Sequence, residues 1–168
     1  MSLAKRFRRD ERGATAVEFA LIALPFFALM MALLETAILF FAAQTLDTAT
    51  ANAARLIRTG QAQQQSLSAE QFKEEICDLV GIFMTCSDLR VEVRTYDDFD
   101  TVDTSSPTSA DGSLPDDLAY EPGNGGDIVV VRAFYEWPVF VNLLGSSLAD
   151  LPNGRRLLTA AAAFRNEP

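Results

Sequence analysis

The residues best placed to do chemistry lie near the start of the chain, where a basic segment meets a long apolar stretch. Residues 12–19 read Arg-Gly-Ala-Thr-Ala-Val-Glu-Phe. A cut after Gly13 would make Ala14 the N-terminal residue, with Glu18 one helical turn further on. The new α-amine and the carboxylate would then lie about 6 Å apart along the helix axis.

This spacing matters because a carboxylate is costly inside a membrane. It costs about 2.5–3.5 kcal/mol at the centre of a membrane helix on insertion scales, and less near an end. A cation at similar depth offsets that cost, and the Ala14 amine of the same or a neighbouring chain supplies one. We therefore predict that Gly13 and Ala14 form a processing site and that Glu18 acts in assembly. The alternative is a glutamate that simply sits in the cytoplasmic headgroup region.

Little else in the sequence can support catalysis. The chain has no histidine, no Gly-x-Ser-x-Gly motif and no phosphate-binding glycine loop, so we predict no enzyme, no cofactor and no small-molecule substrate. Cys77 and Cys86 lie nine positions apart and are expected to form a disulfide in an oxidising compartment. A zinc site is not expected, because two thiols without a histidine do not complete a tetrahedral ligand set.

The element that must position Glu18 is an apolar stretch of 25 residues, 19–43, which is interrupted only by Glu35 and Thr36. About 20 apolar residues cross a hydrocarbon core of roughly 30 Å, so we predict a transmembrane helix. A buried helix of a soluble domain is one alternative. A cleaved secretory signal is another, but its apolar region would be shorter, about 7 to 15 residues.

Charge predicts the orientation of this helix. Five basic and two acidic residues give residues 1–13 a net charge of +3, whereas nine basic and 21 acidic residues give the remainder −12. Because Lys and Arg favour the cytoplasmic side, we expect a cytoplasmic N-terminus and an acidic domain in the periplasm. A chain with a net charge of −9 is also a poor candidate for nucleic-acid binding, which depends on neutralising phosphates.

Two other residues of the span have more than one interpretation. Pro25 lacks an amide donor and would kink a helix interior, which would help the segment move between bilayer and filament; simple tolerance in a membrane helix is the equal alternative. Glu35 lies 17 positions beyond Glu18, or roughly 26 Å along the axis. We expect its carboxylate to be hydrated at the outer interface, with a second subunit contact as the alternative.

Beyond the membrane we expect an α+β fold. The long helix should continue as a stalk, because apolar residues recur at three-and-four spacing over residues 46–57 and Gly60 can end it. Residues 61–67 are expected to form a polar linker. Ser68 and Gln71 form a capping-box pattern at the start of a second helix. The buried face expected for that helix consists of Phe72, Ile76, Leu79, Val80 and Phe83.

The rest of the chain predicts a small antiparallel sheet of three or four strands packed on the long helix. Residues 89–96 alternate between apolar and polar side chains, which indicates a half-buried strand. Residues 127–137 are rich in β-branched and aromatic residues and should form the central strand, ended by Pro138. Residues 155–164 are ambiguous, because their alanines favour a helix whereas the preceding Asn153–Gly154 favours a turn into a strand. We predict a strand.

Residues 97–127 differ in composition from everything around them. They contain nine acidic residues and no Lys or Arg, and they lack the apolar side chains needed to fold alone. A solvated, mobile loop is the prediction, and a calcium site is the alternative, since clustered carboxylates suit a hard cation. The expected organisation is thus a leader at 1–13, a transmembrane helix and stalk at 14–60, and a periplasmic domain at 61–168.

The N-terminal junction resembles the processing site of type IV pilin-like proteins. More narrowly, residues 13–25, the later Leu34–Glu35 and the ending Phe-Arg-Asn-Glu-Pro are similar to the TadE/TadG-type pseudopilins of tight-adherence (Tad, Flp-type) pilus systems. Leu33–Leu34 stands where the family often has a glycine-containing stretch. The resemblance implies cleavage after Gly13 by a prepilin peptidase of the inner membrane. Assembly contacts are expected from Glu18, Phe19, Pro25 and Glu35.

These expectations together predict a minor pilin or pilus-assembly protein of a Tad-type pilus, acting in pilus biogenesis, surface adhesion and biofilm formation. Its partners would be the inner membrane, a prepilin peptidase, other pilins and the Tad assembly machinery. The alternative is a membrane-anchored periplasmic binding or scaffold module that is not incorporated in a filament.

Overall fold

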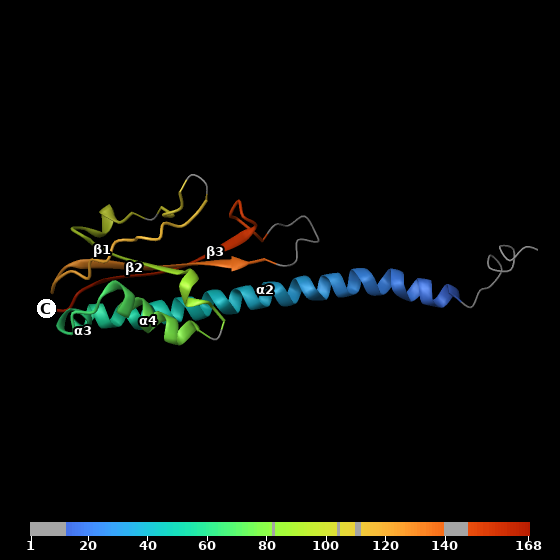
Figure 1. The fold of residues 1–168 in the computed structure, drawn as a ribbon, viewed down its shortest axis with the longest axis horizontal. Helices are drawn as coiled ribbons and strands as arrows, with labels where there is room; N and C mark the ends of the chain where they lie inside the picture. The colour runs from blue at the N-terminus through green and yellow to red at the C-terminus, as the bar shows by residue number, and fades with distance from the viewer. Residues whose placement is uncertain (1–12, 82, 104, 110–111, 140–147) are drawn as a thin grey trace, which may run out of the picture.

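The computed structural model describes residues 13–81, 83–103, 105–109, 112–139 and 148–168. A long helix, α2 (Ala14–Arg58), carries a small domain along one half and extends away from it with the other half (Figure 1). Its 45 residues span about 68 Å at 1.5 Å per residue. The helix ends just before Gly60, as predicted, and Gly60 has a positive φ of 74°. Arg55 and Arg58 lie in the last turn.

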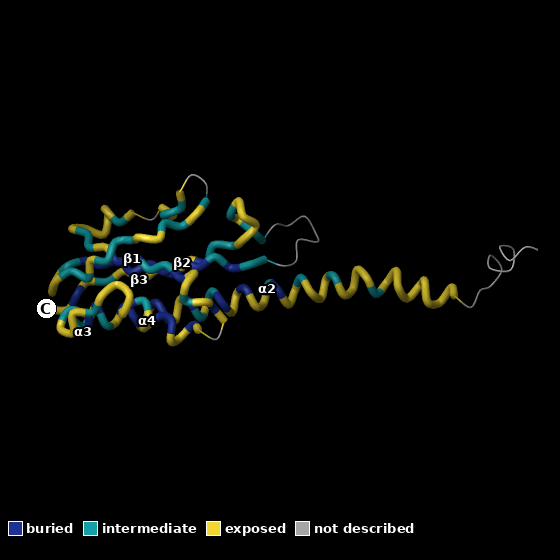
Figure 2. Tube along the Cα trace, in the orientation of Figure 1, coloured by how far each residue is buried: buried dark blue, intermediate teal, exposed yellow. Residues whose placement is uncertain are grey.

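Only the second half of α2 has a buried face, which begins at Glu35. Its apolar members follow the three-and-four spacing of one helical stripe: Leu39, Ala42, Leu46, Ala49, Ala53 and Ile57. This stripe packs on the sheet and on a second helix, whereas the residues before it remain largely exposed (Figure 2). The predicted apolar face of the stalk is therefore confirmed, with the protein's own domain as its partner.

The sheet has three antiparallel strands in the order β1 (Leu89–Tyr96), β2 (Ile128–Pro138) and β3 (Arg155–Arg165). β2 lies in the centre, pairs with both neighbours and is buried along most of its length. The strand predicted for residues 155–164 is confirmed. With α2 on one face of the sheet, the fold is α+β, as the sequence predicted.

Two short helices connect α2 to the sheet. Residues 61–67, predicted as a linker, instead contain one helical turn, α3 (Gln61–Gln64). α4 (Ala69–Val80) begins with the predicted capping box, in which the Gln71 amide donates to the Ser68 hydroxyl and the Ser68 amide donates to the Gln71 side chain.

The buried face of α4 is narrower than predicted. Phe72, Ile76 and Val80 are fully buried, but Leu79 and Phe83 are 49% and 45% exposed. Phe72, Ile76, Cys77 and Val80 span the buried side of α4, and Leu79 lies just beyond its edge, about 20° around the helix from Phe72. The prediction that Leu79 and Phe83 are buried is thus wrong for the chain by itself, because Leu79 lies at the edge of the covered side of α4 and Phe83 lies beyond the end of the helix.

The acidic segment 97–127, predicted as a solvated, mobile loop, is tied to the sheet at several points. Residues 119–121 run parallel to β1: the Val93 amide donates to the Ala119 carbonyl at 2.8 Å, and the Glu121 amide donates to the Val93 carbonyl at 2.9 Å. The Tyr120 ring contacts Phe72 at 5.7 Å between centroids. The described part of the segment therefore lies along the outer edge of β1. The backbone of β1 provides hydrogen-bond partners for residues 119–121.

The same segment also covers the sheet face opposite α2 (Figure 1). On that face the side chains of Ile128, Val130 and Phe134 are buried, although they do not belong to the core shared with the helices. A loop with few apolar residues can lie there because the sheet supplies the apolar surface. No cluster of three or more metal-ligating side chains occurs in the described part of the chain.

Candidate functional site

The predicted processing site lies at the boundary of α2. Gly13 precedes the helix with φ −91° and has no side-chain cap, and Ala14 is the first helical residue. A Cβ added at Gly13 would meet no atom of the described chain within 4 Å. Neither backbone strain nor packing therefore requires glycine at this position. The leader before it, residues 1–12, lies outside the described residues.

Glu18 lies one helical turn after Ala14, on the same side of α2. Its neighbours Val17 and Phe19 are 60% and 70% exposed, so the carboxylate sits within a bare apolar surface. Glu18 forms no hydrogen bond or ion pair with the described residues. The geometry leaves this carboxylate open to a cation from outside the packed domain.

The surface around Glu18 consists almost entirely of large apolar side chains. α2 is long and apolar enough to cross a membrane, and none of its most apolar 18-residue window is buried. Pro25 lies within this stretch, and α2 is assigned as one helix through it, from Ala14 to Arg58. A helix with such a surface fits membrane anchoring, because in water this exposure would be unfavourable.

Glu35 differs from Glu18 in its surroundings. Its exposed fraction is 9%, and it interacts with other atoms of the chain. It is the first residue of the buried face of α2. The Glu35 carboxylate is therefore largely shielded from solvent in this structure, in contrast to the hydrated carboxylate that was expected.

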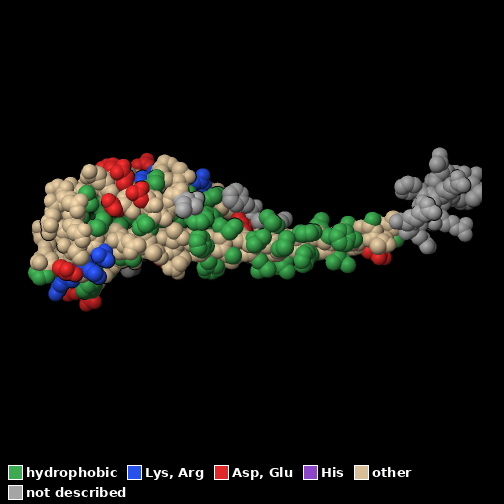
Figure 3. Space-filling view, turned by 90° about the horizontal axis from the view of Figure 1, so that it is seen from below, with side chains coloured by type: hydrophobic (Ala, Val, Ile, Leu, Met, Phe, Trp, Pro, Cys, Tyr) green, Lys and Arg blue, Asp and Glu red, His purple; other side chains and the backbone are tan. Residues whose placement is uncertain are grey.

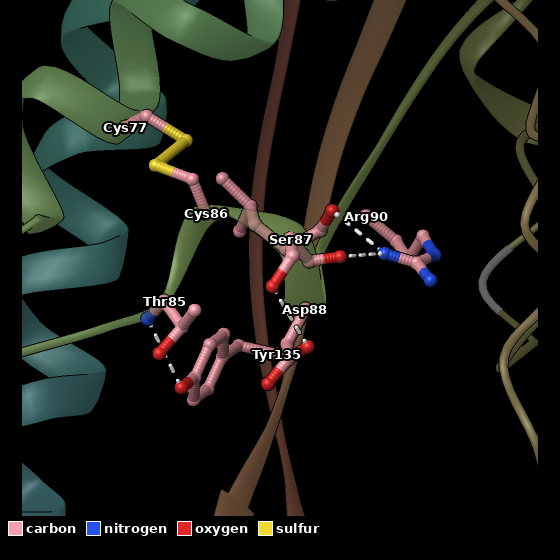
Figure 4. Close-up of a disulfide and its surroundings, with 8 residues drawn as sticks. Cys77, Thr85, Cys86, Ser87, Asp88, Arg90 and Tyr135 are labelled. Atoms are coloured by element: carbon pink, nitrogen blue, oxygen red, sulfur yellow. Dashed lines mark hydrogen bonds between the residues drawn. A yellow bond between two sulfur atoms is a disulfide. The ribbon is translucent and has the colours of Figure 1, made fainter.

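The predicted disulfide is present. It joins Cys77 of α4 to Cys86, the first residue of the 3-10 helix η2 (Cys86–Asp88), with a Cα–Cα distance of 5.6 Å (Figure 4). The turn that it closes is also fixed to the sheet, because the Thr85 amide donates to the Tyr135 hydroxyl at 3.2 Å. The end of α4 is thus held to both the sheet and η2.

A buried ion pair was not predicted from the sequence. Arg132 Nε donates to Glu92 Oε2 at 2.7 Å, and the two residues are 7% and 1% exposed. Arg132 also donates to the carbonyl of Ser105 at 2.7 Å and lies over the Phe134 ring at 5.6 Å. The strand register places Glu92 directly opposite Arg132. Their opposite charges could have indicated the ion pair only if the alignment of the two strands had been known.

The C-terminal residues fasten the domain to the end of α2. Asn166 is 3% exposed, and its side-chain amide donates to the carbonyls of Pro122 and Asn124 at 2.9 and 3.0 Å. The amide of Glu167 donates to the Arg58 carbonyl at 2.8 Å. The ending that resembles the pilin-like family thus has a structural role, which links the acidic segment, β3 and α2.

Comparison with known protein families gives a match over residues 13–55, to the family described as TadE-like protein. The matched range begins at the predicted processing site and includes Glu18, Pro25 and Glu35. Comparisons with curated proteins and with solved structures gave no match. The matched part of the chain, an apolar helix that starts at Gly13–Ala14 and is joined to a small α+β domain, is thus similar to the TadE-like family.

Proposed function

We propose that this chain is a minor pilin or pilus-assembly protein of a Tad-type pilus, matured by a prepilin peptidase that cuts after Gly13. The observation that carries the proposal is the bare carboxylate of Glu18, one helical turn after the first residue of an exposed apolar helix. Its roles would be pilus biogenesis, surface adhesion and biofilm formation. The TadE-like match supports the association with Tad pili.

The proposed maturation works through charge. Removal of residues 1–13 takes away a net charge of +3 and leaves one new cation, the Ala14 amine. In a neighbouring helix staggered by about one turn, that amine comes level with Glu18. The pair has a greater effect in a bilayer than in water, because a lower dielectric strengthens the attraction between opposite charges.

The proposed location is the inner membrane, with α2 spanning it, the leader in the cytoplasm and the domain in the periplasm. The large apolar side chains exposed between Val17 and Phe41 would face lipid before assembly and other pilin helices after it. Other pilins and the Tad machinery are therefore the expected partners, and the prepilin peptidase acts before them.

Intact-mass measurement of the protein purified from membranes tests the maturation. We expect a chain that begins at Ala14. A Gly13→Val variant should keep its leader, because the open space at this position means that only the peptidase requires glycine. An Ala16→Val variant is the matched control: it places the same valine side chain in the same exposed turn and should still be cut. A chain that starts after residue 43 would instead indicate a secretory signal and overturn the proposal.

The alternative function, a periplasmic scaffold that never enters a filament, shares the membrane anchor. Surface fibres sheared from cells separate the two roles: a filament subunit is recovered with the fibres, whereas a scaffold stays with the membrane fraction. In either role, deleting the protein should reduce fibre formation.

A further inference from the structure

The end of α4 nearest the bare half of α2 carries exposed apolar side chains. Leu79 and Phe83 are 49% and 45% exposed, and Phe41 of α2 is 56% exposed. The rings of Phe41 and Phe83 meet edge to face, 5.1 Å between centroids. Leu79 and Phe41 also line one surface hollow of about 300 Å³. These three residues, which we call the collar, join the apolar surface of the helix to the domain.

The collar continues the apolar surface of α2. Figure 3 shows hydrophobic side chains running along the helix and onto the domain where the two meet. Large apolar side chains are exposed on α2 from Val17 to Phe41, so no polar band separates the collar from the segment proposed to span the membrane. The collar therefore adjoins the same environment as that segment.

The position of the collar along α2 indicates which part of the bilayer it meets. A hydrocarbon core of about 30 Å that begins at Glu18 ends about 20 residues later, near Ile38. Phe41 lies three residues further on, about 4.5 Å along the axis. Phe83, in contact with Phe41, lies at the same level. This is the boundary between acyl chains and headgroups, where apolar rings of surface-bound segments are buried.

The collar is also held in place. The disulfide Cys77–Cys86 closes the turn that contains Phe83, and the Thr85 amide is fixed to Tyr135 of β2. Leu79 belongs to α4, which is packed in the core through Phe72, Ile76 and Val80. The apolar groups are thus presented on a rigid support and do not need to be ordered when they meet a surface.

We propose that Leu79 and Phe83 insert into the outer boundary of the bilayer that α2 crosses, and so set the height and rotation of the domain on the membrane. The occupant is phospholipid with neutral headgroups, because the neighbouring Asp78 and the acidic domain disfavour an anionic surface. This inference rests on the proposed membrane-spanning role of α2. It adds a second membrane contact, made by the folded domain itself.

Tryptophan quenching by brominated lipid tests the insertion in the full-length chain, reconstituted at low density in phosphatidylcholine vesicles. The native Trp137 is replaced by phenylalanine, and one tryptophan is introduced by Phe83→Trp, Phe27→Trp or Phe99→Trp. Phe99 is the matched control, because it is 51% exposed and lies at the end of the domain far from the bare helix. If Trp137→Phe impairs folding, Trp137 is retained and each variant is compared with the parent.

We expect Phe83→Trp to be quenched several-fold more than Phe99→Trp by bromine near the headgroup end of the acyl chain. Bromine near the bilayer centre should quench Phe27→Trp most. If Phe27→Trp is quenched and Phe83→Trp behaves like Phe99→Trp, the collar does not touch lipid and the inference is overturned, while the spanning helix stands. If Phe27→Trp is not quenched either, the membrane-spanning role itself fails. A Phe83→Trp emission that is shielded only at high protein density would assign the collar to a second copy of the chain.

Discussion

The two halves of α2 share one secondary structure and have nearly opposite surroundings. Residues 14–34 expose large apolar side chains, whereas residues 35–58 bury a stripe of small and medium ones against the domain. Alanine is about equally frequent in both halves, but in the packed half several alanines lie on the buried face, which lets the sheet approach closely: Ala42, Ala49, Ala53 and Ala54. The bare half is rich in Leu and Phe, which cover a wide surface in every direction. One helix thus serves two environments, and its composition changes where the environment does.

The comparison is clearest for the two glutamates. Replacing each of them by glutamine should give the largest difference, measured as the yield of surface fibres. Glu18 is exposed and open to an external cation, whereas Glu35 is buried and has partners within the chain. We expect Glu18→Gln to abolish most surface fibres, because it removes the charge proposed to pair with the Ala14 amine. Glu35→Gln should keep them. Fibre yield in sheared fractions, at equal protein level, is the measurement.

The opposite result would break the comparison. Normal fibres from Glu18→Gln cells would show that assembly does not need this carboxylate. Loss of fibres in Glu35→Gln, with a domain that remains folded, would return Glu35 to the role of a subunit contact.

Leucine truncations in the two halves should differ almost as clearly. Leu46 is fully buried, so Leu46→Ala should lower the free energy of unfolding of the domain by about 2–5 kcal/mol. Leu24 is 74% exposed, so Leu24→Ala should change it by less than about 0.5 kcal/mol. Denaturant unfolding in detergent, followed by near-UV circular dichroism, measures both. Equal losses of unfolding free energy would mean that the bare half of α2 also contributes to the stability of the domain.

The disulfide sharpens the comparison at the point where the two halves meet. Replacing both Cys77 and Cys86 by alanine opens a short loop and should lower the free energy of unfolding by about 2–3 kcal/mol. Reduction of the native protein should give the same loss, which serves as the control. If neither treatment lowers it, α4 and Tyr135 hold the turn without the covalent link.

The smallest effects are expected at the far end of the packed half. Asn166→Ala removes the two hydrogen bonds that a buried side-chain amide donates to the carbonyls of Pro122 and Asn124 and should cost about 1–3 kcal/mol. Arg58→Ala removes an ion pair with Glu167 that spans 3.6 Å between half-exposed side chains, so its cost should stay below about 1 kcal/mol. The same unfolding measurement compares them. If both variants lowered the free energy of unfolding equally, the buried Asn166 amide would not be the main contact that holds the C-terminus to the domain.

Local patterns predicted most of the elements. The three-and-four spacing of the stalk, Gly60 and the Ser68 capping box each act within a few residues, so they fix where helices begin and end. β2 followed from its β-branched run. The alanine-rich β3 was ambiguous because its local propensity favours a helix, and pairing with β2 decides in favour of a strand.

What the sequence did not predict depends on contacts between distant residues. Glu92 and Arg132 are 40 positions apart, and their pairing requires the strand register. The acidic segment has no pattern of its own, and its place follows from the edge and the second face of the sheet. Leu79 and Phe83 were assigned to the core by type and spacing, but the domain leaves the edge of α4 and the turn after it exposed.

The strand order has a consequence for how the chain is made. β2 is central but pairs on its far side with β3, the last strand in the sequence. During synthesis, α2 and β1 leave the ribosome long before β3 does. The sheet cannot be completed until these last residues have been made. If α2 spans the membrane as proposed, the domain therefore takes its final form only after the whole chain has been inserted.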